Sequence, residues 1–160
     1  MKKCNIIFTA AGVLSISAVL FTVFWTHQSN KPLPAGTVDK AVVNPIVSVL
    51  YSEKDYDDAV ECVKDFFPEF ENCELKTLRY GGDLITTEET NYYSKSENGT
   101  VSQNNTEYII LLSDFYVNPE PLFHSCNDAW NHDSTYTDWK WILARTKDTD
   151  NWKIITYGYD

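Results

Sequence analysis

An acidic residue between apolar neighbours is the feature of this sequence that comes closest to a catalytic group. Asp114 lies inside a stretch rich in Tyr, Ile, Leu and Phe, which is typical of a buried β-strand. A carboxyl group on the inward face of such a strand has a raised pKa and suits general acid–base chemistry. Tyr80, Tyr136 and Arg145 are its candidate partners. The alternative, which is favoured, is that Asp114 makes an ion pair or a backbone hydrogen bond at the sheet edge.

A dense set of aromatic residues near the C-terminus indicates a second kind of site. Trp139 and Trp141 fall on one face of a predicted strand, and Trp152 and Tyr157 lie in the next strand. Cross-strand aromatic pairs stabilise a twisted sheet, so packing in the core is the favoured interpretation. The alternative is that an exposed subset of these rings forms a platform for a ligand or a glycan.

A run of oxygen-bearing side chains precedes that region. Asn127, Asn131 and Asp133 are of the type that binds Ca²⁺, which takes six to eight oxygen ligands. The glycine and the terminal glutamate of an EF-hand loop are missing from this run, so a solvated loop with Asx turns is favoured. The spacing of Cys and His residues fits no zinc site. No metal or other cofactor is therefore expected.

The cysteines leave two alternatives open. Cys4 precedes a long apolar run, whereas Cys62, Cys73 and Cys126 follow it, so at least one of these three is unpaired. Cys62 and Cys73 are near in sequence, and geometry decides whether they form a disulfide. Otherwise they are buried thiols, which pack as small apolar side chains.

The secondary-structure elements that must position these groups follow an N-terminal targeting segment. Residues 6–25 form an uncharged apolar run, long enough for a helix across a membrane. Lys2 and Lys3 precede it, so the positive-inside rule places residues 1–5 in the cytoplasm and the rest outside. This predicts a single-pass signal anchor in the cell membrane, a tether over 26–46, and an extracellular domain over 47–160. The alternative is a cleaved leader and a secreted protein.

The pattern of residues 47–160 predicts an α+β fold. Ser52 is a helix cap, and apolar residues at helical spacing follow it as far as Pro68. Strands are predicted over 75–80, 107–117, 136–146 and 152–159, with a short helix over 86–93. The expected fold is a long amphipathic helix packed on a curved antiparallel sheet.

Charge excludes one class of function. The chain has 13 Lys and Arg against 23 Asp and Glu, a net charge of -10. Binding to nucleic acid by neutralising phosphates needs a cationic surface, so no nucleic-acid partner is expected. The expected partners are the membrane, through the N-terminal helix, and a protein or a small apolar ligand.

The sequence also resembles a known family over roughly residues 50–160. The most specific part is the run SerThrTyrThrAspTrpLysTrpIleLeu at 134–143, followed by Trp152 and Gly158-Tyr159. These residues resemble an uncharacterised family of extracytoplasmic domains from Gram-positive bacteria, a domain of unknown function. The family is similar to the nuclear-transport-factor-2-like cone, which implies helices packed in a curved sheet. The resemblance supplies no activity, because this fold has many functions.

These observations favour a membrane-anchored extracytoplasmic module that binds a ligand or a protein. The alternative is a small enzyme, similar to an isomerase, dehydratase or hydrolase, that uses the pocket of the cone with Asp114 as its base.

Overall fold

The computed structural model of the chain describes residues 32–96, 106–120, 130–147 and 151–159, together with Thr22, Phe24 and Thr26. Its elements follow in chain order: β1 (Val42–Val43), α2 (Glu53–Phe66), the 3-10 helix η1 (Phe67–Glu69), β2 (Cys73–Tyr80), α3 (Asp83–Ser96), β3 (Thr106–Val117), β4 (Ser134–Thr146) and β5 (Lys153–Gly158). All of them belong to one unit, made of Pro34–Asn118 and Asn131–Asp160, and the description below concerns that unit.

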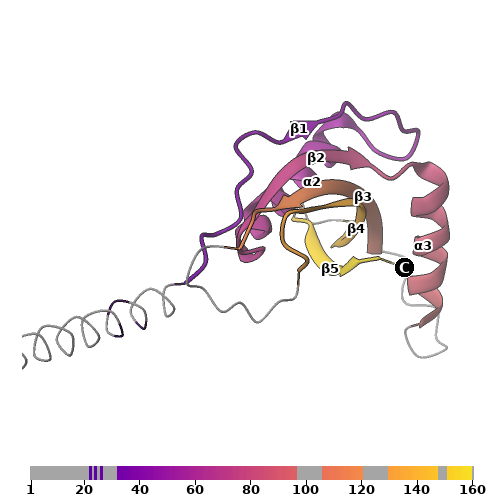
Figure 1. Ribbon diagram of the computed structural model, residues 1–160. Helices are drawn as coiled ribbons and strands as arrows, with labels where there is room; N and C mark the ends of the chain where they lie inside the picture. Colours follow the sequence, from indigo (N-terminus) through magenta and orange to yellow (C-terminus); the bar gives the residue numbers. More distant parts are fainter. Residues whose placement is uncertain are drawn as a thin grey trace, which may run out of the picture. The chain divides into compact units, whose positions relative to one another are not determined.

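The five strands form one sheet in the order β1-β2-β3-β4-β5. β1 is parallel to β2, and every other neighbouring pair is antiparallel. The longest pairing is that of β3 with β4, which runs from Thr106↔Thr146 to Val117↔Ser134. Figure 1 shows β2 to β5 arching over α2, so the helix occupies the concave side of the sheet.

α2 begins where the sequence predicts and is fixed by a capping box. The Ser52 hydroxyl accepts a hydrogen bond from the Asp55 amide, and the Asp55 carboxylate accepts one from the Ser52 amide. The helix then buries Ala59, Val60 and Val63 against the sheet. Pro68 follows within η1, where its missing amide hydrogen costs nothing.

The core lies between α2 and the sheet and is built mainly from aromatic rings. Phe67, Phe70, Phe115 and Trp141 are all buried, with neighbouring ring centroids 5.2 to 6.5 Å apart. Such distances are those of favourable edge-to-face and offset ring pairs. Phe67 and Phe70 come from η1 and its C-cap, whereas Phe115 and Trp141 come from β3 and β4. Alternate residues of a strand share one face, so the face of β3 and β4 toward α2 belongs to this core.

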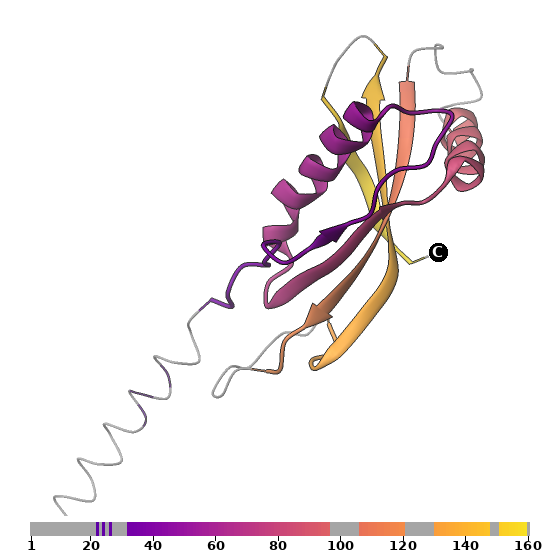
Figure 2. The ribbon, with the colours of Figure 1, turned by 90° about the horizontal axis from the view of Figure 1, so that it is seen from above.

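α3 lies on the other side of the sheet, as Figure 2 shows. There it covers a smaller cluster of buried residues contributed by β3 and β4: Tyr108, Ile110, Ile142 and Ala144. Ile85 and Tyr93 of α3 pack against this cluster and are only partly buried. α3 therefore covers part of this face and leaves the rest to be lined by polar side chains.

The predicted fold class is wrong in the type of its sheet. The sheet is mixed and not antiparallel, because β1 pairs with β2 in the parallel direction. A parallel pair needs a long crossover, and here the crossover contains α2. β1 lies inside the range 26–46 assigned to the tether. Two residues are too short a strand to produce a recognisable alternation in the sequence.

The fold class is also wrong in its membrane-spanning helix. The predicted signal anchor at 6–25 falls outside the described residues, except for Thr22 and Phe24. Among the residues that are described, no helix is long and apolar enough to cross a membrane. α2 and α3 have 14 residues each, a length of about 21 Å, whereas a span needs about 30 Å. The corrected fold is a five-stranded mixed sheet with one short helix on each side.

Candidate functional site

A pocket opens on the α3 side of the sheet, where β4 and β5 extend beyond the small cluster. Its volume is about 410 Å³, and its lining comes from three elements: Glu89, Tyr92 and Tyr93 of α3, Lys140 and Ile142 of β4, and Thr156 to Tyr159 in and after β5. The pairing of β4 with β5 explains which residues form the floor of the pocket, because Lys140 lies opposite Gly158 and Ile142 lies opposite Thr156. Side chains two apart on a strand point to the same side, so these positions share one face.

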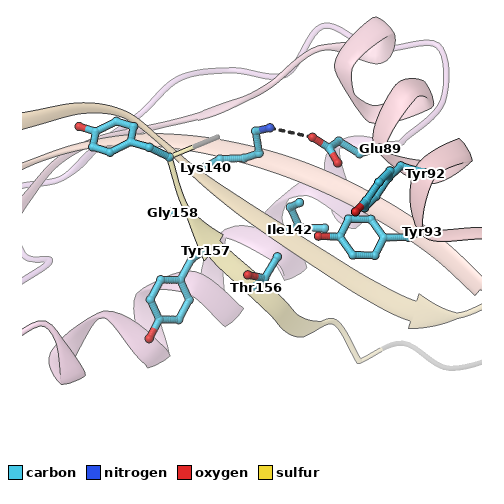
Figure 3. A pocket seen from close by; sticks show the side chains of 9 residues that line it. Glu89, Tyr92, Tyr93, Lys140, Ile142, Thr156, Tyr157 and Gly158 are labelled. Carbon is cyan, nitrogen blue, oxygen red and sulfur yellow. Dashed lines mark hydrogen bonds and ion pairs between the residues drawn. The ribbon is translucent and has the colours of Figure 1, made fainter. Parts of the chain in front are cut away.

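An ion pair lies in this pocket. The Lys140 Nζ donates a hydrogen bond of 2.7 Å to Glu89 Oε1, and the two side chains are only 12% and 20% exposed. Figure 3 shows the two side chains extending toward each other from the sheet and the helix. A pair this sheltered from water is stronger than a surface pair, and it satisfies two charges that would be costly to bury alone.

Tyrosine rings stand next to this ion pair. Helical spacing brings Tyr92 and Tyr93 onto the same side of α3 as Glu89. The Tyr93 ring stacks on Tyr108, with centroids 5.7 Å apart, and forms a T-shaped pair with Tyr92 at 5.2 Å. Tyr92 itself is 65% exposed. Figure 3 shows Tyr157 pointing away from Glu89, toward α2, so Tyr92 and Tyr93 are the rings beside the pair.

Gly158 keeps the pocket open beside Lys140. Its φ of +151° is in a range that favours glycine, and a Cβ built on it would meet no atom within 4 Å. A larger residue at this position would extend into unfilled space opposite Lys140.

The predicted base Asp114 lies elsewhere and has a structural role. Its carboxylate accepts hydrogen bonds from the Thr77 hydroxyl (2.7 Å) and the Asp138 amide (2.9 Å), with Arg79 at 3.8 Å. The β3–β4 register is interrupted at this point, and Asp138 has a φ of +57°. A β-bulge leaves one backbone amide of its strand without a partner in the sheet. Here that amide belongs to Asp138 of β4, and the Asp114 carboxylate accepts its hydrogen bond. Asp114 lines none of the pockets described here.

Tyr80 and Tyr136 do not lie beside Asp114. The Tyr80 hydroxyl donates to the Asp83 carboxylate at the start of α3, at 2.8 Å. The Tyr136 hydroxyl accepts from the Asn131 amide, at 2.9 Å, and its ring stacks on the core. Each phenol is therefore engaged at a different place in the fold.

Arg145 is the centre of a network on the α2 side. It donates to Asp55 at 2.6 Å and to Glu107 at 2.9 Å, and its guanidinium lies 4.3 Å from the Trp152 ring centre. Burial alone would raise the pKa of the Asp55 carboxyl, but hydrogen bonds from Ser52 and Arg145 outweigh it and lower the pKa. The network fixes the start of α2 to the sheet. The four catalytic candidates are thus not brought together.

The predicted aromatic platform divides between core and surface. Trp141 is fully buried and donates from Nε1 to the Ser113 hydroxyl at 2.8 Å. Trp152 is 5% exposed and donates to a backbone oxygen of α2. Trp139 is half-buried among neighbouring rings, and Tyr157 is 43% exposed. Only Tyr157 of the four has a face free enough to meet a partner.

The candidate metal ligands are not assembled within the described residues. Asn127 lies outside them, and Asp133 accepts a hydrogen bond of 2.5 Å from the Tyr116 hydroxyl. The backbone amide of Asn131, as noted, is engaged by Tyr136. Within the described ranges, no group of three or more His, Cys, Asp or Glu residues could hold a metal ion.

Cys62 and Cys73 are free thiols, so the disulfide between them is not formed. Burial raises the pKa of both, that of Cys73 to about 12. A thiol with a raised pKa is a poor nucleophile, because the thiolate is the reactive form. Cys126 lies outside the described residues.

Sequence reasoning missed Glu89, Tyr93 and Lys140. Glu89 and Tyr93 are four apart in a predicted helix, and Lys140 alternates with the two tryptophans, so each face could have been assigned. What joins them is a contact across 51 positions, which only the fold establishes.

Comparison with family models, with curated proteins and with solved structures gave no match to this chain. The resemblance to an extracytoplasmic, nuclear-transport-factor-2-like family therefore stays a prediction.

Proposed function

We propose that this protein is a binding module for a neutral, hydroxyl-rich ring compound of the sugar class. The observation that supports the proposal is the sheltered Glu89–Lys140 pair beside tyrosine rings in a pocket of about 410 Å³. Pockets for small ligands have volumes of about 300–1,000 Å³, so this one suits one or two sugar rings.

The ion pair favours a neutral ligand. Glu89 already neutralises Lys140, so an anion would have to separate the pair and leave a half-buried carboxylate behind. A hydroxyl group both donates and accepts hydrogen bonds. It therefore bonds to the carboxylate of Glu89 and to the ammonium of Lys140 without disturbing either charge.

The tyrosines favour a ring. Tyr92 and Tyr93 present aromatic surface with polar tips, and Tyr92 is 65% exposed. Aromatic side chains provide a large rigid contact area at low entropic cost. A sugar has apolar C–H faces and polar edges, which matches rings that stand beside an ion pair.

This proposal changes the expected ligand from apolar to polar. A purely apolar ligand would cover the charges of Glu89 and Lys140 and remove them from water without offering a hydrogen bond in return, which is unfavourable. We do not propose the enzyme alternative, because Asp114, its base, is held in a bulge by Thr77 and the Asp138 amide.

The test is calorimetric or NMR titration of the full chain with glucose, N-acetylglucosamine and their dimers, with inorganic phosphate as the charged comparison. We expect saturable binding of at least one neutral sugar with a Kd on the order of 0.1–10 mM, and weaker binding of phosphate. Saturable binding of phosphate alone, or of none of these probes, would contradict the proposal.

A matched pair of variants locates the site. Glu89→Gln removes the negative charge of the acceptor and its ion pair with Lys140, so it should weaken sugar binding about tenfold, which corresponds to about 1.4 kcal/mol. Glu88→Gln makes the same change on the neighbouring exposed residue, which does not line the pocket, and should leave the Kd unchanged. Equal effects of the two variants would place the sugar elsewhere. Melting curves check that both variants fold.

A further inference from the structure

β5 presents an open sheet edge. One side of β5 pairs with β4, and among the described strands none pairs with its other side. The backbone groups along an open edge readily pair with another strand. The opposite edge ends in β1, which has only two residues and so provides little to pair with.

Apolar side chains are exposed along this edge. Ile155, Tyr157 and Tyr159 are 51%, 43% and 57% exposed, within a run of five residues. Natural proteins protect edge strands with charges and with bulges. β5 contains a single charged residue, Lys153 at its start, and one bulge at Ile155, where the pairing passes from Ile142↔Thr156 to Leu143↔Ile154. An edge of this composition gains free energy when a partner covers it.

A groove of about 480 Å³ accompanies the edge on its α2 side. It is mostly apolar and is lined by Cys62, Asp65, Phe66, Trp152, Lys153, Ile154, Ile155 and Tyr157. Any strand that adds to β5 therefore also brings side chains over this groove, because alternate residues of a strand point to the same face.

The charges of the groove are placed at its two ends. α2 runs in the same direction as β5, because Asp55 at its start bonds Trp152, and Phe66 at its end packs on Tyr157 with ring centres 5.4 Å apart. Asp65 therefore lies near the end of β5, whereas Lys153 begins the strand. Both are exposed, and neither makes an ion pair with any residue that the structure describes.

We propose that the partner of this edge is a second copy of the chain, paired antiparallel through β5. Antiparallel pairing places the start of one β5 beside the end of the other, so Lys153 of each copy approaches Asp65 of its partner. A parallel arrangement would instead bring the two lysines together. The groove is thus self-complementary, which a two-fold symmetric interface requires. The two sheets then join into one, and the two grooves lie side by side on the same face of it.

The test uses the full chain in sedimentation equilibrium at rising concentration. The expected result is a reversible monomer–dimer equilibrium. Ile155→Lys puts a charge in the centre of the interface and should raise the dissociation constant about tenfold or more. Leu84→Lys is the matched control, because Leu84 is 72% exposed on α3, away from β5, and its change should have no effect. A chain that stays monomeric, or a dimer that Ile155→Lys leaves intact, would overturn the proposal.

Charge exchange tests the direction of pairing. Lys153→Glu and Asp65→Lys each place like charges at both ends of the interface and should weaken the dimer. The double variant restores opposite charges and should recover most of the affinity. If the double variant is weaker than both single variants, the antiparallel arrangement is wrong. Neither residue lies beside the Glu89–Lys140 pair, so sugar binding should survive dissociation, and the two proposals can fail separately.

Discussion

The two faces of the sheet are built from the same strands but differ in how completely a helix covers them. On one face α2 and η1 bring Phe66, Phe67 and Phe70 against Trp141, with ring centroids 5.2 to 6.5 Å apart. On the other face α3 contributes only partly buried residues to a small cluster and leaves a pocket beside it. The large buried rings are concentrated on the α2 face, whereas the α3 face keeps an open pocket.

The helices themselves explain the difference. α2 has an apolar stripe that buries four of its 14 residues, whereas Thr86 is the single buried residue among those of α3 whose side chains are described. α3 is instead held by polar contacts at its start, where the Asp83 carboxylate accepts hydrogen bonds from the Ser48 hydroxyl and the Val49 amide. Farther along, α3 contacts the sheet through the Glu89–Lys140 ion pair and the stacking of Tyr93 on Tyr108, so polar and aromatic contacts take the place of an apolar stripe.

The largest effect should come from the centre of the α2 face. Trp141→Ala removes a fully buried ring and leaves the Ser113 hydroxyl without its donor, so we expect a loss of about 3–5 kcal/mol in the free energy of unfolding. Urea denaturation followed by circular dichroism measures it. A loss below about 1 kcal/mol would show that this ring is not part of the core and would remove the contrast between the faces.

The two faces can be compared directly by truncating two adjacent residues of β4, one on each face. Leu143 is fully buried toward α2, and Ile142 is 4% exposed in the α3 cluster and lines the pocket. Truncation to alanine at such sites costs about 2–5 kcal/mol, and the cost is smaller where the site can relax or admit water. We therefore expect Leu143→Ala to lose about 3–4 kcal/mol and Ile142→Ala about 2 kcal/mol. The same denaturation assay ranks them, and an equal or reversed order would contradict an open α3 face.

Local sequence signals were sufficient for the α2 face. The Ser52 cap, the apolar stripe and the alternation of Trp139 and Trp141 place the helix and the strands, and the observed α2 starts at Glu53. These signals act over a few residues, so they survive in a single sequence. The parallel strand β1 left no such signal, because its two residues are defined only by their pairing with Thr77 and Leu78.

The other errors of the sequence-based predictions concern contacts between segments that are distant in the sequence. Asp114 looks like a buried acid in the sequence, but it lies opposite a bulge of β4 that contains Asp138, and its carboxylate contacts Thr77 and Arg79. The bulge depends on the register of two strands and not on the residues around Asp114 alone. The Glu89–Lys140 pair was missed for the same reason, since the separate patterns of helix and strand do not show which parts of them meet.

The smallest predicted effect is a difference in how acid acts on the two helices. Asp55 fixes the start of α2, and Asp83 fixes the start of α3. For Asp55, burial raises the pKa, but hydrogen bonds from Ser52 and Arg145 lower it overall; for Asp83, hydrogen bonds from Ser48 and Val49 lower the pKa. A carboxyl group with a lowered pKa in the folded state stabilises the fold above its unfolded pKa, and the contribution is lost as the pH falls through the folded value.

We therefore expect the free energy of unfolding to fall below about pH 4, and Asp55→Asn and Asp83→Asn each to flatten this dependence. Salt separates the two. Part of the Asp55 effect comes from the charge of Arg145 and should decrease in 1 M NaCl, whereas the main partners of Asp83 are neutral groups, so its effect should persist. Chemical denaturation with urea at pH 3 and pH 6, with and without salt, measures the contributions of Asp55 and Asp83 to the free energy of unfolding. Equal salt sensitivity of the two variants would mean that Arg145 does not act through Asp55, and that the two helices are attached to the sheet by the same kind of contact.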